Sequence, residues 1–320
     1  MLIAIQALHA MPKIVTLTLN PALDIAPHVE RLMPAHKMRC HDVRRDPGGG
    51  GINVARAVHR LGGETLAVYA AGGSSGDEIQ NLLAREGLRQ RPVRVAAPTR
   101  ESFNIFEDST GQQYRFVLPG EPLSRAEGER CIAEALAVAA PGDYLVASGS
   151  LPPGLPAGFY AEAFGAAKGV RTVIDAQGEA LRLVLDHGVG IVKASAREMG
   201  EYLGTAPQDV RDWRDALAAL VRSGKAGVAV VTLGEQGSVL AGEGRAWRAE
   251  VPPVKSSTTV GAGDSFLGGL LVKLSEGAAL DAALRFAAAA GTAALLTTGT
   301  GLCQRADVDR LLSAVTISEL

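Results

Sequence analysis

The segment best suited to phosphate chemistry is Gly261-Ala262-Gly263-Asp264, which runs into an apolar helical stretch at 267–274. Two glycines allow a tight turn that exposes successive amide N–H groups at a helix N-terminus, where the helix dipole favours an anion. The amides of Gly261, Ala262 and Gly263 would then stabilise a transferring phosphoryl group while Asp264 takes a proton from a hydroxyl. The same motif is also typical of a glycine-rich turn with Asp264 as a helix cap, and its spacing does not decide between the two.

A second glycine-rich segment, at 47–57, reads PGGGGINVARA. Four consecutive glycines carry a high cost in backbone entropy. A ligand that approaches the bare backbone would explain them, and so would a flexible loop. The run leads straight into Ile52-Asn53-Val54, a helix start with a polar residue on its first turn, which favours the ligand interpretation.

Other phosphate and hydrolytic chemistries lack their motifs. The sequence contains no G-x-x-x-x-G-K-[ST] and no H-E-x-x-H, and the glycines at 261 and 263 do not continue as G-x-G-x-x-G after a strand. Ser148-Gly149-Ser150 lacks the glycine spacing of a nucleophile elbow, which argues against a serine hydrolase.

Short β-branched runs alternate with helical patterns along most of the chain, and this order predicts a parallel sheet with helices on both faces. The strand-like runs lie at 14–19, 65–70, 144–147, 172–174, 190–192 and 228–233. The helical patterns include 52–61, 77–86, 125–139 and 209–222.

Two regions depart from this alternation. The segments 24–32 and 37–45 are extended without a helix between them, and 102–106 and 113–117 alternate in polarity around a turn at 108–111. These four segments predict a small separate sheet whose closure would exclude water from a cleft. A pair of surface hairpins is the alternative.

Composition limits the class of protein. The 320 residues are 47% hydrophobic with a net charge of −2, so the chain lacks the basic surface of a nucleic-acid binder. No apolar run reaches the roughly 18 residues of a membrane span. The stretch 286–296 instead predicts a packed core helix. Three widely spaced cysteines indicate a reducing compartment, and residues 1–12 lack the positive region of a signal peptide, so we expect a cytoplasmic protein with an N-terminal extension.

With these motifs together, the chain resembles the ribokinase-like (PfkB-type) sugar kinases, and within them the type-2 bacterial 6-phosphofructokinases. The resemblance runs from Lys13 to about Arg310. It implies a three-layer α/β/α sandwich over 13–320 with a mostly parallel central sheet. It also implies a small β-sheet lid, with strands inserted at about 24–45 and 100–118. The specific stretches are 16–19, 47–57, 113–117, 148–154, 254–256 and 259–265.

The resemblance also implies roles for single residues. Asp264 matches the catalytic base, and the amides of Gly261, Ala262 and Gly263 match the anion hole. The residues expected against the sugar are Asp24, Gly49, Gly50 and Asn53. Those expected at its phosphate are Lys37, Arg100, Arg115 and Ser150, with Lys37 reaching across a dimer. A guanidinium binds phosphate oxygens in a bidentate way, which suits both arginines.

The nucleotide side maps onto a further set of residues: Lys193, Ser195, Thr232, Gly234, Gly237, Ser256 and Thr297. Glu198 matches the acidic residue that holds Mg²⁺ through water. Two positions depart from the family, because Ser195 and Thr297 stand where relatives have Asn. A hydroxyl still bonds a metal-bound water, but it is shorter than an amide.

The implied activity is transfer of the ATP γ-phosphoryl group to the 1-hydroxyl of fructose 6-phosphate, with Mg²⁺, in a homodimer that forms through the lid. Tagatose 6-phosphate and fructose 1-phosphate are alternative substrates. Relatives that use them carry Lys inside the glycine run, where this chain has Gly50. A catalytically impaired regulator that binds sugar phosphates is the alternative of another class, motivated by Ser195.

Overall fold

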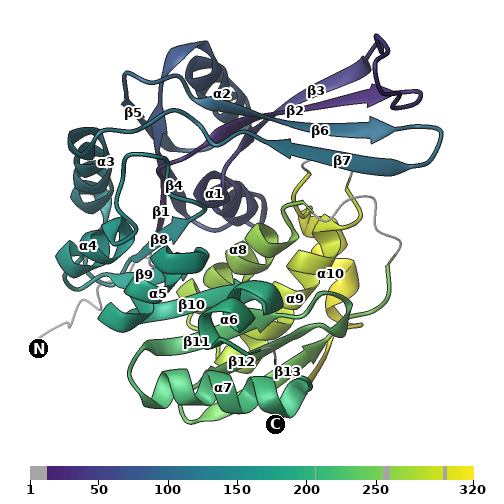
Figure 1. The fold of residues 1–320 in the computed structure, drawn as a ribbon. Coiled ribbons are helices and arrows are strands. Elements are labelled where there is room, and N and C mark those ends of the chain that lie inside the picture. The colour runs from purple at the N-terminus through teal and green to yellow at the C-terminus, as the bar shows by residue number, and fades with distance from the viewer. Residues whose placement is uncertain (1–12, 206, 255–259, 298–300) are drawn as a thin grey trace, which may run out of the picture.

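The computed structural model describes residues 13–205, 207–254, 260–297 and 301–320. The described residues form two separate sheets (Figure 1). The main sheet has ten strands in the order β14-β13-β12-β11-β10-β9-β8-β1-β4-β5. Their bounds are β1 Ile14–Thr18, β4 Thr65–Ala71, β5 Gln90–Arg94, β8 Tyr144–Ser148, β9 Arg171–Asp175, β10 Val189–Ser195, β11 Ala226–Thr232, β12 Ser238–Gly242, β13 Arg245–Glu250 and β14 Thr316–Glu319.

Most of the main sheet is parallel, as predicted. Each pair from β5 to β11 runs parallel, whereas β12, β13 and β14 follow as an antiparallel edge. The six predicted strands are all present, each within three residues of its expected ends. Strands β5 and β12–β14 were not predicted.

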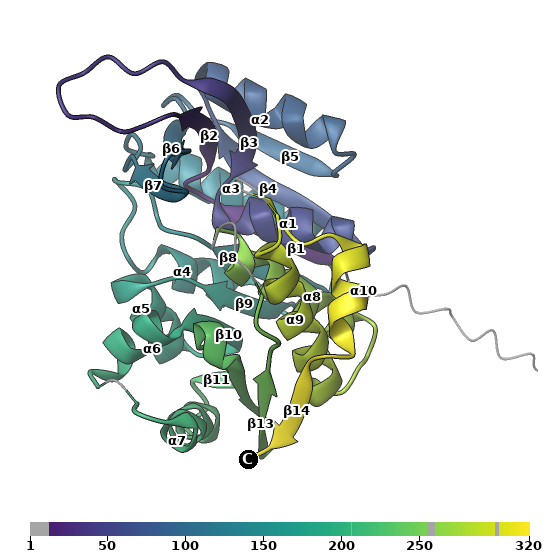
Figure 2. The same ribbon diagram turned by 90° about the vertical axis from the view of Figure 1, so that its right-hand side faces the viewer.

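Helices cover both faces of the main sheet (Figure 2). Helices α3–α7 pack on one face, while α1, α2 and α8–α10 pack on the other, which confirms the three-layer α/β/α fold. The predicted core helix at 286–296 corresponds to most of α9, which is buried along nearly its whole length. The helix bounds are α1 Gly50–Arg60, α2 Gly73–Arg85, α3 Arg125–Val138, α4 Phe159–Ala166, α5 Gly178–His187, α6 Ala196–Leu203, α7 Val210–Arg222, α8 Ala262–Ser275, α9 Leu280–Ala294 and α10 Arg305–Leu312. Among the described residues, no helix has the length and apolar character needed to cross a bilayer.

The second sheet, called the small sheet below, consists of β3-β2-β6-β7 and projects from one end of the main body (Figure 1). Parallel pairing of β2 with β6 joins the two predicted insertions, and the turn at 108–111 connects β6 and β7 as expected. One boundary was wrong, because β3 begins at His41 and leaves Lys37 in the exposed loop before it. The bounds are β2 Ala22–Val29, β3 His41–Gly48, β6 Arg100–Glu107 and β7 Gln112–Val117.

Close approach of α1 and α8 determines where the two glycine-rich motifs meet. A Cβ placed on Gly268 of α8 would lie 2.8 Å from Cβ of Ala57 and 3.3 Å from the carbonyl oxygen of Val54, both on α1. Only glycine therefore allows this separation of the two helices. The helices carry Asn53 and Asp264, so their spacing also sets the distance between these two side chains.

We expect Gly268→Val to lower the free energy of unfolding by about 1–3 kcal/mol, because overpacking forces the two helices apart. Denaturant unfolding measures the change. Ala219→Val, at an exposed position of α7, is the control for β-branching alone and should change stability by less than about 0.7 kcal/mol. Equal effects of the two variants would contradict close packing at Gly268.

Candidate active site

The predicted catalytic motif lies at the N-terminus of α8, beside the carboxyl ends of the parallel strands. Gly261 is the N-cap, with φ of 78°, and its carbonyl accepts the first helical bond from Ser265 at 2.8 Å. The first amides of a helix have no intrahelical partners, so those of Ala262 and Gly263 remain available to an anion. The N-cap position is occupied by Gly261 and not by Asp264, which argues against the helix-cap alternative.

Asp264 is held by a side chain from the other glycine-rich motif. Asn53 donates a hydrogen bond from Nδ2 to Oδ2 of Asp264 at 3.0 Å. Burial, and then the charge of Asp175, raise the pKa of Asp264 to about 7, while Lys193, the Asn53 bond and Arg115 act in the opposite direction. A carboxyl group that titrates near neutrality is suited to general-base catalysis.

A buried cation lies directly under the helix N-terminus. Lys193 at the end of β10 forms a 3.0 Å ion pair with Asp175 at the end of β9. Burial lowers the pKa of Lys193, but Asp175 and Asp264 outweigh it and the net pKa is raised. A Cβ on Gly263 would lie 2.7 Å from Nζ of Lys193, so the absence of a side chain at position 263 allows the ammonium group to approach the end of the helix. Sequence reasoning missed Asp175, although an acid at the carboxyl end of a buried strand was a usable signal.

The glycines at 48–51 pack tightly against other parts of the protein. Neither the ligand interpretation nor the flexible-loop interpretation of the sequence predicted this packing. A Cβ on Gly48 would lie 2.3 Å from the carboxylate of Asp24, and one on Gly50 would lie 2.3 Å from Oγ of Ser148. Gly49 has φ of 111° and Gly51 faces Thr18. The run therefore packs its backbone against the ends of β1, β2 and β8, and a flexible loop is excluded.

The residues predicted for the sugar and its phosphate come from the small sheet and the strand ends. Asp24 is buried on β2, and burial raises its pKa to about 6 although Arg115 and Arg100 oppose this shift. Arg115 is exposed on β7, and its charge acts on both Asp24 and Asp264. Of the expected cations, Arg115 therefore acts on both Asp24 and Asp264, Arg100 acts on Asp24, and Lys37 lies in its exposed loop.

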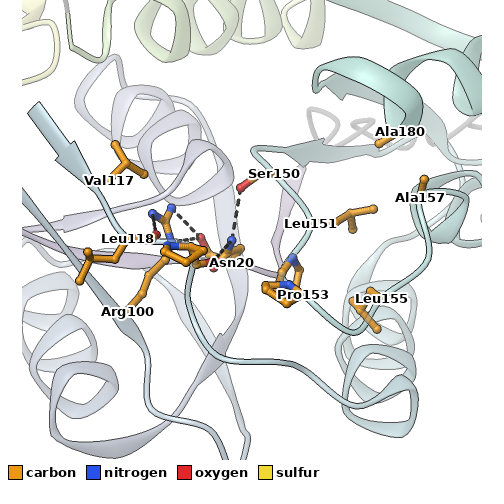
Figure 3. Close-up of a pocket in the computed structure, with 12 residues that line it drawn as sticks. Asn20, Arg100, Val117, Leu118, Ser150, Leu151, Pro153, Leu155, Ala157 and Ala180 are labelled. Carbon is orange, nitrogen blue, oxygen red and sulfur yellow. Dashed lines mark hydrogen bonds between the residues drawn. The ribbon is translucent and has the colours of Figure 1, made fainter.

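Arg100 and Ser150 line one open pocket of about 510 Å³ (Figure 3). Arg100 donates from Nη1 to the carbonyl of Leu118 at 3.0 Å and from Nη2 to that of Asn20 at 3.2 Å. The amide of Asn20 donates in turn to Oγ of Ser150 at 3.3 Å. These bonds hold Arg100 and Ser150, both predicted to bind the phosphate, in the lining of the same pocket. Asn20, which bonds to both residues, was not predicted.

A second pocket, of about 530 Å³, lies beside the α8 N-terminus. Thr232, Gly234 and Gly237 line it, as predicted for the nucleotide, and Ala262 and Gly263 form the part nearest Asp264. The apolar residues that line this pocket were not predicted, because no sequence motif distinguishes them from core residues. They are Val251, Pro252, Pro253, Val254, Phe266, Ala288, Gly291 and Leu295.

Ser256 and Thr297, also predicted for the nucleotide, are not among the described residues that line this pocket. The hydroxyl of Thr297 donates to the carbonyl of Ala294 at 2.8 Å, and Thr297 is not among the described residues that line the pocket. Ser256 and the N-terminal extension at 1–12 lie outside the described residues.

Ser195 and Glu198 bond to each other at the start of α6. Oγ of Ser195 accepts from the amide of Glu198 at 3.3 Å, and Oε2 of Glu198 accepts from the amide of Ser195 at 2.8 Å, which is a capping box. Among the described residues, no three side chains of metal-ligating type come together. Magnesium that keeps its waters and binds nucleotide phosphates needs few protein ligands, so a single carboxylate such as Glu198 fits it.

A helix N-terminus that opens onto a pocket, with a buried cation beside it and a carboxyl whose pKa is near neutrality, is an arrangement suited to phosphoryl transfer. Residues 15–307 match the family described as pfkB family carbohydrate kinase. The chain belongs to this family.

The relatives are similar over nearly the whole chain. The ATP-dependent 6-phosphofructokinase isozyme 2 of Mycobacterium tuberculosis is 44% identical over 301 residues, which cover 93% of this chain and 88% of the relative. The Escherichia coli protein of the same name is 40% identical over 307 residues, covering 94% and 98%. Several 1-phosphofructokinases match at 28–30% identity. The structure of Escherichia coli phosphofructokinase-2 in complex with substrates and products has a TM-score of 0.90 and 39% identity, covering 94% of this chain and 99% of that one.

The raised pKa of Asp264 predicts a stability effect that is independent of activity. The unfolded carboxyl has a pKa of 3.8 and the folded one about 7, so stability falls as pH rises between these values and the full cost is present above pH 7. Asp264→Asn should therefore unfold at higher denaturant concentration than the parent at pH 8. The difference should disappear below pH 4. A variant that is less stable than the parent at pH 8 would show that the carboxylate is well solvated.

Proposed function

We propose that the protein transfers the γ-phosphoryl group of ATP to the 1-hydroxyl of fructose 6-phosphate, giving fructose 1,6-bisphosphate and ADP. The observation that carries this is the position of Asp264. It directly follows Ala262 and Gly263, which line a largely apolar pocket suited to a nucleoside, and its carboxyl bonds Asn53 and is influenced by the charge of Arg115 on the small sheet. The relatives at 40–44% identity carry the corresponding name.

In the proposed reaction, Asp264 accepts the proton of the sugar hydroxyl as its oxygen attacks the γ-phosphorus and ADP leaves. Asn53 orients the carboxylate through their 3.0 Å bond. The amides of Gly261, Ala262 and Gly263, with the Lys193 ammonium beneath them, stabilise the charge on the phosphoryl oxygens. When bound, Mg²⁺ supplies further charge neutralisation at the nucleotide phosphates.

The sugar phosphate is proposed to bind Arg100, Arg115 and Ser150, with Lys37 of the partner subunit. Asp24, Gly49 and Asn53 would hold the hydroxyls. The glycine at position 50 supports the choice of fructose 6-phosphate over tagatose 6-phosphate or fructose 1-phosphate as the substrate. A side chain there would meet Oγ of Ser148 and the amide of Gly149, at 2.3 and 2.9 Å, so the lysine found in those relatives does not fit this backbone.

The proposed nucleotide site combines the pocket residues Thr232, Gly234 and Gly237 with Lys193 and Ser195. Glu198 would hold Mg²⁺ through water. Ser256 and Thr297 remain predictions for this side.

A homodimer through the small sheet is proposed from its surface. The large apolar side chains that are exposed in the described part of the chain all lie on this sheet or its adjoining loops: Met33, Met38, Val43, Phe116, Val117 and Leu118. Such a patch favours a protein interface. A cytoplasmic location also remains a prediction, supported by the free thiols of the three cysteines.

A kinetic panel of fructose 6-phosphate, tagatose 6-phosphate and fructose 1-phosphate with Mg·ATP tests the function. We expect the highest kcat/KM for fructose 6-phosphate, and a kcat about 10²–10⁴-fold lower in Asp264→Asn, the range for loss of a general base. Sugar binding to the variant should be nearly unchanged. Release of ADP without a preference for fructose 6-phosphate would contradict the proposed substrate. Binding without any ADP release would support the regulator.

The capping box makes Ser195 and Glu198 testable without loss of α6. Asn is as good an N-cap as Ser, and Gln completes a capping box as Glu does. We expect Ser195→Asn to lower the Mg²⁺ concentration for half-maximal rate several-fold, because its longer amide reaches a metal-bound water. Glu198→Gln should raise that concentration by about 10–100-fold, the range for outer-shell changes at metal sites. Unchanged Mg²⁺ dependence in both variants would show that the ion binds elsewhere.

A further inference from the structure

Arg56 is a charged residue of α1 that is completely buried, with 0% of its side chain exposed. Its guanidinium forms a fork with the carboxylate of Glu86, the residue that follows α2. Nε donates to Oε2 at 2.9 Å and to Oε1 at 3.1 Å, and Nη2 donates to Oε1 at 2.5 Å. Burial of a cation is costly, and a buried ion pair is weak support for stability on its own.

The remaining donors of Arg56 point to the catalytic region. Nη1 donates to the carbonyl of Pro47 at 3.0 Å, immediately before the glycine run, and lies 3.5 Å from Oδ1 of Asn53. Nη2 is also 3.8 Å from Oδ1 of Asp46, the strand partner of Asp24. Arg56 therefore contacts both ends of the segment that leads to Asn53.

These contacts determine which end of the Asn53 amide faces Asp264. With Oδ1 toward the guanidinium, Nδ2 points to the carboxylate of Asp264, where the 3.0 Å bond forms. The reversed amide would place its NH₂ against a cation and its oxygen against a carboxylate. Both contacts would be repulsive, so a cation at position 56 favours one orientation.

We propose that Arg56 is a positioning residue for proton abstraction: anchored by Glu86, it fixes Pro47 and the Asn53 amide, and through Asn53 it orients Asp264. This inference rests on the proposed role of Asp264 as the base. A purely structural ion pair would contribute to folding without changing how Asp264 titrates.

The groups that face Asp264 set the direction of the expected pH effect. Asp175 from β9 raises the pKa of Asp264, whereas Lys193 from β10, the Asn53 bond from α1 and Arg115 from β7 lower it. Release of the Asn53 amide removes one lowering interaction. The acid limb of kcat/KM, where the base becomes protonated, should then move to higher pH.

The test removes the charges of Arg56 and Glu86 together, because Arg56→Met alone would leave the Glu86 carboxylate without its main partner. In Arg56→Met with Glu86→Gln, we expect kcat to fall about 10–100-fold, the size of a misplacement near 1 Å. KM for ATP should stay within about two-fold, and the acid limb should move upward. Asn53→Ala should shift the limb likewise, and adding the pair of changes to Asn53→Ala should have no further effect.

Arg89→Met with Glu64→Gln is the matched control, since it removes a 2.9 Å ion pair from the surface. If the acid limb of kcat/KM is unchanged in Arg56→Met with Glu86→Gln, or if the effects of these changes add to those of Asn53→Ala, the positioning role of Arg56 is wrong. The proposed role of Asp264 as the base would not be affected. Near-normal turnover in Asp264→Asn would overturn the base and this inference together. If the neutral pair does not fold, Arg56→Gln decides, because it removes the cation that orients the Asn53 amide while Arg60 still faces Glu86 at 3.6 Å. A shifted limb supports positioning, and an unshifted one contradicts it.

Discussion

The active site depends on how closely helix α8 approaches the buried Lys193–Asp175 pair at its first turn and helix α1 at Gly268. Glycine makes each contact possible, at 261 for the left-handed cap, at 263 against the Lys193 ammonium and at 268 against α1. Because helix dipole, cation and acid are then within a few ångströms of one another, the pKa of Asp264 reflects all of them. A side chain at any of these glycines would separate groups that act together.

Two carboxyl groups and one ammonium group are buried together beside the N-terminus of α8. The carboxylates Asp175 and Asp264 share one buried lysine, so they cannot both ionise as easily as a solvated acid. Arrival of a nucleotide would add negative charge at the amides, where the helix N-terminus and Lys193 offset it. The small sheet contributes Arg115, whose charge lowers the pKa of both Asp24 and Asp264, so the position of this sheet affects the proposed sugar site and the proposed base.

The sequence allowed the parallel sheet and the small sheet to be predicted, because β-branched runs and alternating polarity are local signals. A common site for the two glycine-rich motifs was implied only by the resemblance to the kinase family. The sequence did not reveal β12 and β13, which form an antiparallel hairpin, or β14, a four-residue strand after α10. It also did not reveal the apolar pocket proposed for the nucleotide, whose Pro252 and Phe266 resemble ordinary core residues. Asp175 and Arg56 were missed for a different reason. Their importance comes from burial beside Lys193 and Asn53, which only tertiary packing creates.

The central claim is that burial and the neighbouring charges hold the Asp264 carboxyl near neutrality in the folded protein. NMR of protein labelled with ¹³C at the aspartate carboxyls measures this directly, with Asp264→Asn as the assignment control. The account predicts one aspartate signal that titrates at a pH of about 7 and is missing from the variant. An Asp264 signal that titrates at the ordinary pKa near 4 would contradict the account.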